Sequence, residues 1–320
     1  MGTFIVNNFG YVFVIGLILG NAVCEARTKA DPVKRIAITI DDAPSPPTKM
    51  FTGQQRALSI IEKLKQVDAP AVGIFAIGKH AVDFGSDQLM SYGLAGHAIC
   101  NHTYSHNSLK YCSVENYIKD IQKAEHQLKD IPGYTRLFRY PYLDEGYPAQ
   151  SKKMQTALND MGYTHANITI NNCDYYMCHL LQRGLQSGKR LDVDKLRSVY
   201  LKVMLECVEY FEDWFVLQGK TNMNHVLLMH SNDLTALYIG DLVAELRNRG
   251  WTVISIHEAY KPVPEDFNNA TTITTKAVPT NPARARNSPK GMSPRYLAEL
   301  FQQEKVFLDA KPNETYTASK

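Results

Sequence analysis

The stretch from Lys34 to Ser45 reads KRIAITIDDAPS and shows the pattern that repeats along the chain. Its β-branched run predicts a buried strand, and the Asp-Asp-Ala-Pro that follows predicts a turn. Similar strand patterns occur at 34–40, 71–77, 97–101, 136–142, 165–170, 226–230 and 252–256. Helical spacing of apolar residues occurs between them, at 54–67, 114–130, 151–161, 192–215 and 237–249.

This alternation of strands and helices predicts a parallel α/β sheet, and the number of units favours a (β/α) barrel over an open sheet. In such barrels the functional side chains gather at the C-terminal ends of the strands. Polar residues capable of chemistry follow the expected strands repeatedly: Asp41 and Asp42, His102 and His106, Arg139, Asp174, and His230. We therefore expect one catalytic domain over residues 34–260, with these side chains together at one end.

His102 and His106 are four residues apart, a spacing that puts two imidazoles on one face of a helical turn. With one carboxylate, such a pair makes a divalent-metal site that keeps positions open for water and substrate. The alternative is a chance pair among the ten histidines of the chain. A zincin-type metalloprotease needs Glu directly after the first His, and Thr103 in that position argues against one.

The adjacent carboxylates Asp41 and Asp42, at the end of an expected strand, could have two different roles. One can ligate a metal while the other takes a proton from water. The alternative is an Asp pair that serves only a turn or a helix cap. His230, at the end of VLLMH, could protonate a leaving group, although a lone histidine after an apolar strand is more often structural.

Five segments, taken together and in order, resemble the motifs of the polysaccharide deacetylases, the NodB-homology domain of carbohydrate esterase family 4. They are TIDDAPS at 39–45, AGHAICNHTYSH at 95–106, RYPY at 139–142, NNCDYY at 171–176 and LLMHSND at 227–233. The resemblance covers about residues 34–260 and implies a deformed (β/α) barrel. It also implies hydrolysis of an N-acetyl group from a sugar, with release of acetate.

The resemblance implies that Asp42, His102 and His106 bind a divalent metal, usually zinc. Asp41 would be the general base. Arg139 would keep Asp41 ionised and oriented, as a guanidinium beside a carboxylate does.

The resemblance also assigns groups around the leaving amine and the acetyl methyl group. Tyr142 would offer its backbone N–H to the oxyanion, and His230 would be the general acid. Asp174 would orient His230 and favour its protonated form, with Asp233 as the alternative partner of that imidazole. Leu228 would help to line the pocket for the acetyl methyl group.

The two ends of the chain differ from this central part. The apolar run from Phe4 to Val23, followed by Cys-Glu-Ala, predicts a signal peptide over 1–26, with an uncleaved anchor as the alternative. We therefore expect an exported protein, either secreted, periplasmic or associated with the cell envelope. Residues 261–320 are rich in Thr, Pro and Asn and predict a flexible tail with a short amphipathic helix near 293–306.

The composition restricts the partners. A formal net charge of +3 over 320 residues gives no basic footprint for nucleic acid, and an uncharged glycan needs no electrostatic steering. No stable protein partner is predicted. Two rival functions stay open: an O-acetyl esterase or small-amide hydrolase with the same site, and a glycan-binding protein with a vestigial site.

Five cysteines follow residue 26, so at least one thiol has no partner within this part of the chain. Cys173 and Cys178 could form a disulfide. The alternative is that each cysteine is a small buried side chain.

Overall fold

The structure is a computed structural model, and it describes residues 33–261 and 293–308. The predicted signal segment and the rest of the predicted tail, 262–292 and 309–320, lie outside the described residues. Among the helices of the described part, none is both long and apolar enough to cross a membrane.

The central feature is a parallel sheet in the order β5-β4-β3-β2-β1-β7, with β8 beside the start of β1. Its strands are β1 (Arg35–Ala43), β2 (Gly73–Ala76), β3 (Ala98–Asn101), β4 (Tyr134–Phe138), β5 (Thr164–His165), β7 (Asn224–His230) and β8 (Thr252–Val253). All pairs in this sheet are parallel, as the alternation of strands and helices predicted.

The segment after β5 closes the sheet into a deformed barrel. At the β5 edge of the sheet, the Ala166 N–H continues the pairing with β4 by donating to the Phe138 carbonyl oxygen at 2.7 Å. At the other edge, the Ile170 N–H donates to the carbonyl oxygen of Val226 on β7, and the Leu228 N–H donates back to Ile170, both at 3.0 Å. One short irregular segment therefore contacts both edges, which confirms the predicted deformed (β/α) barrel and single domain.

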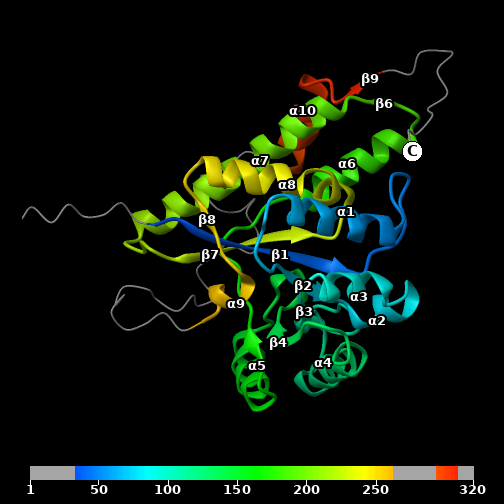
Figure 1. Cartoon of the computed structure of the whole chain (residues 1–320). Coiled ribbons are helices and arrows are strands. Elements are labelled where there is room, and N and C mark those ends of the chain that lie inside the picture. Colours follow the sequence, from blue (N-terminus) through cyan, green and yellow to red (C-terminus); the bar gives the residue numbers. More distant parts are fainter. Residues whose placement is uncertain (1–32, 262–292, 309–320) are drawn as a thin grey trace, which may run out of the picture. The chain divides into compact units, whose positions relative to one another are not determined.

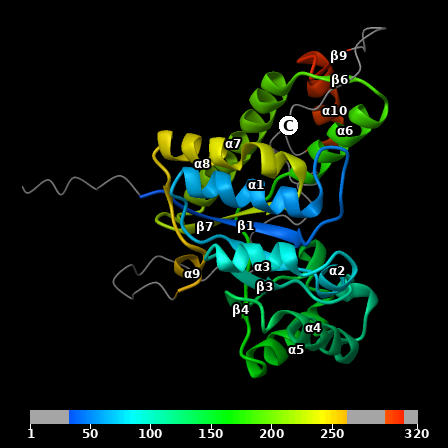
Figure 2. The same ribbon diagram turned by 45° about the vertical axis from the view of Figure 1, so that its right-hand side comes forward.

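Helices surround the sheet, and Figures 1 and 2 show α1 and α8 side by side next to β1 and β7. They are α1 (Gly53–Gln66), α2 (Gly78–Asp83), α3 (Asp87–Leu94), α4 (Val114–Leu128), α5 (Pro148–Asp160), α6 (Asp174–Gln186), α7 (Val193–Leu217), α8 (Asp233–Asn248), α9 (Ile256–Ala259) and α10 (Pro294–Gln303). Short 3₁₀ turns occur at Leu109–Tyr111 and Pro141–Leu143.

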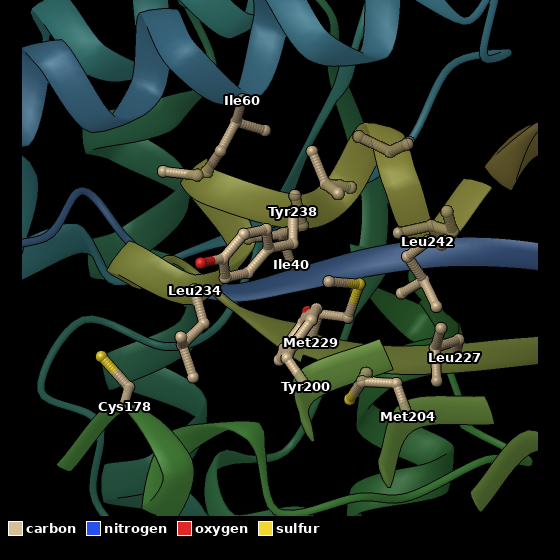
Figure 3. Close-up of a cluster of buried hydrophobic side chains, with 14 of the residues drawn as sticks. Ile40, Ile60, Cys178, Tyr200, Met204, Leu227, Met229, Leu234, Tyr238 and Leu242 are labelled. Carbon is tan, nitrogen blue, oxygen red and sulfur yellow. The ribbon is translucent and has the colours of Figure 1, made fainter. Parts of the chain in front are cut away.

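Alternation along β1 divides its side chains between two environments. Ile36, Ile38 and Ile40 belong to the main hydrophobic core, whereas Thr39 and Asp41 contact a buried arginine on the other face. Figure 3 shows the core side: Ile40 lies among side chains that include Ile60, Leu227, Met229, Leu234, Tyr238 and Leu242. Burial of this apolar face fixes the register of β1 and so directs its polar residues into the barrel.

Three strands end earlier than the sequence predicts. The strand expected to reach Tyr142 stops at Phe138, because Pro141 has no N–H to donate and Tyr142 has a left-handed φ of 58°. The strand expected at 165–170 is regular only to His165. The last strand ends at Val253, and Ser255 then caps α9.

The described end of the chain packs onto the domain. Ser293 caps α10 as predicted, since its hydroxyl accepts from the Tyr296 N–H. The buried side chains Leu297, Leu300 and Phe301 belong to the main core, and α10 contacts α6 and α7. β9 (Phe307–Leu308) then pairs antiparallel with β6 (Arg190–Leu191).

No disulfide forms among the five cysteines of the described part, so the Cys173–Cys178 alternative is not realised. Four of them are buried: Cys100, Cys173, Cys178 and Cys207. Cys100, Cys178 and Cys207 pack in hydrophobic core clusters.

Candidate active site and metal centre

The register of β1 against β7 places the expected acid and base together. Asp41 is paired with His230, and Thr39 with Leu228, in adjacent parallel strands. Paired residues in a sheet direct their side chains to the same face. Asp41, Leu228 and His230 accordingly line one cavity of about 400 Å³ at the C-terminal end of the strands.

The same cavity contains a cluster of possible metal ligands. Asp42, His102 and His106 offer three ligand atoms that all lie within 4.8 Å of one another. Asp42 Oδ1 lies 3.2 Å from His106 Nε2 and 3.5 Å from His102 Nε2. This oxygen is buried, and among the described residues no group donates a hydrogen bond to it, so it is an acceptor of the kind that a cation would satisfy.

The orientation of His102 also fits a metal ligand. Its Nδ1 lies 2.9 Å from the Arg139 carbonyl oxygen, which can only accept, so Nδ1 carries the proton. The Nε2 lone pair is then free for a cation on the side of Asp42. One carboxylate and two imidazoles suit zinc and similar divalent ions, so the residues present fit such a group.

The loop that carries both histidines is not the helical turn that their spacing suggested. Residues 102–106 are non-helical, and Thr103 and His106 have left-handed φ values of 65° and 57°. Asp120 on α4 holds the loop by accepting from the backbone N–H groups of Tyr104 and Ser105 at 3.2 and 3.0 Å. The ring centroids of the two histidines are nevertheless 5.0 Å apart, so this non-helical loop also brings the two imidazoles close together.

Asp41 is held by a buried ion pair. Asp41 Oδ1 accepts from Arg139 Nη1 at 2.6 Å, and both side chains are at most 5% exposed. Although burial opposes its charge, the nearby Asp41 carboxylate raises the pKa of Arg139. Arg139 therefore lies beside Asp41, the residue that the sequence predicted as the base.

Arg139 has further partners that the sequence did not predict. Arg139 donates to Thr39 Oγ1 at 2.7 Å and to the Ala166 carbonyl oxygen at 3.0 Å, and it lies over the ring of Phe75. The Tyr260 hydroxyl lies 3.4 Å from Nη2. Thr39, a polar residue inside an otherwise apolar strand, was the one local signal for this network.

His230 is bound to Asp174 in the structure. His230 Nδ1 lies 2.6 Å from Asp174 Oδ1, and the backbone N–H of His230 donates to Asp174 Oδ2 at 2.9 Å. Burial disfavours the imidazolium, but the contact with Asp174 and the charges of Asp42 and Asp41 outweigh it and raise the pKa of His230 to about 10. The contacts of His230 thus favour its imidazolium form, the form that could donate a proton.

Asp233, the alternative partner, contacts a different cation. Its Oδ1 accepts from Arg56 Nε at 2.8 Å, and its Oδ2 accepts from Thr48 and Gln182. Arg56 and Asp233 are both fully buried beneath the loop that follows β1. The structure thus decides between the two carboxylates in favour of Asp174.

The remaining expected residues lie at the same cavity. Tyr142 and Leu228 both line it, and the Tyr142 ring contacts His106 with centroids 4.7 Å apart. Five further residues line the cavity, and no role for them was predicted from the sequence: Leu143, Asn171, Asn172, Cys173 and Tyr175. Asn172 connects two elements of the site, because its amide donates to the Leu228 carbonyl oxygen and its Oδ1 accepts from the Asp174 N–H.

Comparison with known proteins identifies the class. A sequence profile of the polysaccharide deacetylase family matches residues 28–166. YheN of Bacillus subtilis (strain 168), named as a polysaccharide deacetylase, is 25% identical over 235 residues, which cover 72% of this chain and 70% of that protein. The peptidoglycan-N-acetylglucosamine deacetylase of Bacillus cereus is 35% identical over 108 residues, which cover 33% of this chain and only 36% of the relative.

The fold agrees with these matches. A solved structure of a mutant CE4 family pseudoenzyme with restored enzymatic activity has a TM-score of 0.50 and 20% sequence identity, covering 72% of this chain and 69% of the other. At this identity the likeness concerns the fold alone. The resemblance to the polysaccharide deacetylases that the motifs of this chain carry is therefore confirmed, with a profile match over residues 28–166.

Proposed function

We propose that this chain is a divalent-metal-dependent hydrolase that removes N-acetyl groups from an N-acetylated glycan or oligosaccharide and releases acetate. The observation that carries the proposal is the pairing of Asp41 with His230 beside the cluster of Asp42, His102 and His106. A base and a protonated imidazole then face one cavity together with three ligand atoms. The family and the B. cereus relative, named for a deacetylase of N-acetylglucosamine in peptidoglycan, support the substrate class.

The roles of the residues follow from their contacts. Zinc held by Asp42, His102 and His106 would supply Lewis-acid polarisation of the amide carbonyl and of a water molecule. Asp41, fixed by Arg139, would take the proton of the attacking water. His230, charged through Asp174, would give its proton to the departing amine, so that amide and water become amine and acetate.

Two further groups would act on the substrate itself. The Tyr142 backbone N–H would donate to the oxyanion of the tetrahedral intermediate. Leu228, buried on β7 at the cavity, would contact the methyl group of the acetyl and so favour short acyl groups.

The direct test is acetate release across defined sugars, including N-acetylglucosamine oligomers, peptidoglycan fragments and O-acetylated xylan, with and without a chelator. We expect release from the N-acetylated sugars, loss with chelator and recovery with Zn²⁺. Release from the O-acetyl esters alone would replace the proposal by an esterase. Glycan binding by the wild type without any turnover would replace it by a binding protein.

Variants separate the metal from the base. We expect Asp41→Asn to lower turnover by about 10²- to 10⁴-fold while Zn²⁺ affinity, measured by isothermal titration calorimetry, stays within a few-fold. His106→Ala should lose both turnover and Zn²⁺ affinity. The matched control is His126→Ala, an exposed histidine on α4, which should keep both.

We also propose that the protein is exported. The apolar run from Phe4 to Val23 and the small residues Cys24 and Ala26 support a cleaved signal segment. Expression with the natural leader, followed by N-terminal sequencing of the mature protein, tests this. We expect a mature chain that begins at Arg27, and retention of the intact leader in the cytosol would contradict export.

A further inference from the structure

A buried ion pair lies behind the loop that carries Asp42. Arg56, in the first turn of α1, has a side chain that is 1% exposed, and its partner Asp233 is fully buried. Arg56 Nε donates to Asp233 Oδ1 at 2.8 Å. Asp233 is the first residue of α8 and comes three residues after His230. The ion pair therefore joins α1 to the segment that directly follows the proposed general acid.

The other donors of Arg56 reach the loop after β1. Its Nη1 donates to the Ser45 hydroxyl at 2.8 Å and to the Pro46 carbonyl oxygen at 2.9 Å. Its Nη2 donates to Thr48 Oγ1 at 3.3 Å, and the Thr48 hydroxyl donates in turn to Asp233 Oδ2 at 2.7 Å. One guanidinium thus binds the loop and the carboxylate together, which its planar arrangement of donors on three nitrogens allows.

Ser45 connects this network to the acid side of the site. Its hydroxyl lies 2.9 Å from the hydroxyl of Ser231, the residue after His230. The Ser231 N–H donates to the Asp41 carbonyl oxygen at 2.8 Å. The backbone of Ser45 is held as well, because the Gln88 amide pairs with its N–H and carbonyl oxygen at 3.1 and 3.2 Å. One buried hydroxyl therefore ties the segment of the proposed base to the segment of the proposed acid.

Asp42, three residues before Ser45, has a backbone conformation that needs such support. Its φ is 67°, in the left-handed region that L-residues rarely adopt. A residue in this conformation persists only where the surrounding structure holds it. The Ala43 carbonyl oxygen accepts from the Ile77 N–H at 2.9 Å, and Arg56 fixes Ser45 a little further on. The place of the Asp42 carboxylate in the metal cluster therefore depends on how this loop is anchored.

We propose that Arg56 is a positioning residue, which acts through Ser45 and Asp233 to hold the loop of Asp42 and the segment of His230 in register with each other. It would support a metal ligand and the general acid from behind, without touching the substrate. This inference rests on the proposed function for the roles of Asp42 and His230, and it deepens that function by naming the buried group that holds them.

The first test replaces the guanidinium by an ammonium. Arg56→Lys keeps a cation for Asp233 but loses the fork that also binds Ser45 and Pro46. We measure Zn²⁺ affinity by isothermal titration calorimetry, and kcat and KM for acetate release at saturating Zn²⁺. We expect Zn²⁺ affinity and kcat each to fall about 10-fold with KM nearly unchanged, since groups behind a metal ligand have effects of this size. Unchanged Zn²⁺ affinity and kcat, whatever the stability of the variant, would overturn the inference.

The matched control is Ser59→Ala. Ser59 lies on the next turn of α1, and its hydroxyl donates to the Ala236 carbonyl oxygen on α8 at 2.8 Å. This change removes a contact between the same two helices that does not reach the loop after β1. We expect Ser59→Ala to keep the Zn²⁺ affinity and kcat of the wild type. Losses equal to those of Arg56→Lys would show that any loosening of α1 against α8 has this effect, which contradicts a specific role for Arg56.

Ser45→Ala tests the route of the effect, and it deletes only one hydroxyl, so it also serves if Arg56→Lys does not fold. We expect Zn²⁺ affinity to fall about 10-fold. Because Arg56 acts through Ser45, the two changes together should lower Zn²⁺ affinity by clearly less than the product of the two single effects. A double variant that shows the full product would overturn the proposed route.

Zn²⁺ affinity also separates the failure of this inference from the failure of the proposed function. If the wild type releases acetate from no sugar, but Arg56→Lys and Ser45→Ala weaken Zn²⁺ binding and Ser59→Ala does not, the positioning role stands and the proposed function falls. If the wild type releases acetate and Arg56→Lys and Ser45→Ala match its kcat and Zn²⁺ affinity, the positioning role falls and the proposed function stands.

Discussion

Asp174 Oδ1 and His230 Nδ1 lie 2.6 Å apart, although the two residues are separated by 56 positions in the chain. Asp174 is the first residue of α6 and His230 is the last residue of β7. Since the carboxylate is fully buried and also accepts from the Asn232 amide at 2.8 Å, it has little freedom to leave the imidazole. This contact sets both the charge and the direction of the His230 ring.

The first prediction concerns this contact. Asp174→Asn removes the largest influence that raises the pKa of His230, so the basic limb of the activity profile should move to lower pH. At pH 8 we expect turnover to fall about 10²-fold, within the range of general acid catalysis. The measurement is kcat against pH for acetate release.

The control for Asp174→Asn is Asp233→Asn, which changes a neighbouring buried carboxylate whose cation is Arg56. Asp233→Asn should lower the free energy of unfolding but leave the position of the basic limb unchanged. A basic limb that moves equally in both variants would contradict the assignment of Asp174.

The second prediction concerns pH and folding. Because the pKa of His230 is raised from its ordinary value to about 10, the folded state favours the protonated ring. This contribution to stability is fully present below pH about 6.5 and is lost as pH rises through about 10. In metal-free protein, urea unfolding between pH 6 and 11 should show a decline that His230→Asn reduces.

His126→Asn, on the exposed face of α4, is the reference for this experiment. It should retain the decline of the wild type. If His230→Asn also retains the full decline, the high pKa of His230 is wrong.

The third prediction concerns the buried ion pair of Arg139 and Asp41. Arg139→Met leaves the Asp41 carboxylate buried without its cation, and such changes cost about 3–5 kcal/mol in the free energy of unfolding. An exposed pair gives a matched comparison, because Arg197 and Asp241 also lie 2.6 Å apart. Arg197→Met should cost less than about 1 kcal/mol, since water screens that pair. Equal losses in the two variants would show that burial does not govern the effect.

The fourth prediction concerns the C-terminal helix. Leu297 on α10 is fully buried in the main core, so Leu297→Ala should cost about 2–5 kcal/mol in the free energy of unfolding. Glu299 lies on the same helix but is half exposed and forms an ion pair with Arg295, so Glu299→Ala should cost less than about 1 kcal/mol. A Leu297→Ala protein as stable as the wild type would mean that α10 does not pack in solution.

The sequence by itself determined the parallel barrel and the set of residues at its C-terminal end. Both follow from local properties: β-branched runs with period two, helical runs between them, and polar residues directly after each strand. The end of β1 illustrates this, since Ile36, Ile38 and Ile40 must face the core and Asp41 must therefore face inward. The cap at Ser293 was also predictable from the sequence, because an N-cap side chain bonds to a backbone N–H only three residues further along the chain.

The tertiary structure decided what depends on residues far apart in the chain. The choice of Asp174 over Asp233 could not come from spacing, because it depends on Arg56 reaching Asp233 from α1. The helical turn expected for His102 and His106 was wrong, since Asp120 holds that loop in a non-helical form. The closure of the barrel at Ile170 and the Tyr260 contact with Arg139 share this origin. Their energies come from desolvation and contact between distant segments, which local sequence preferences do not contain.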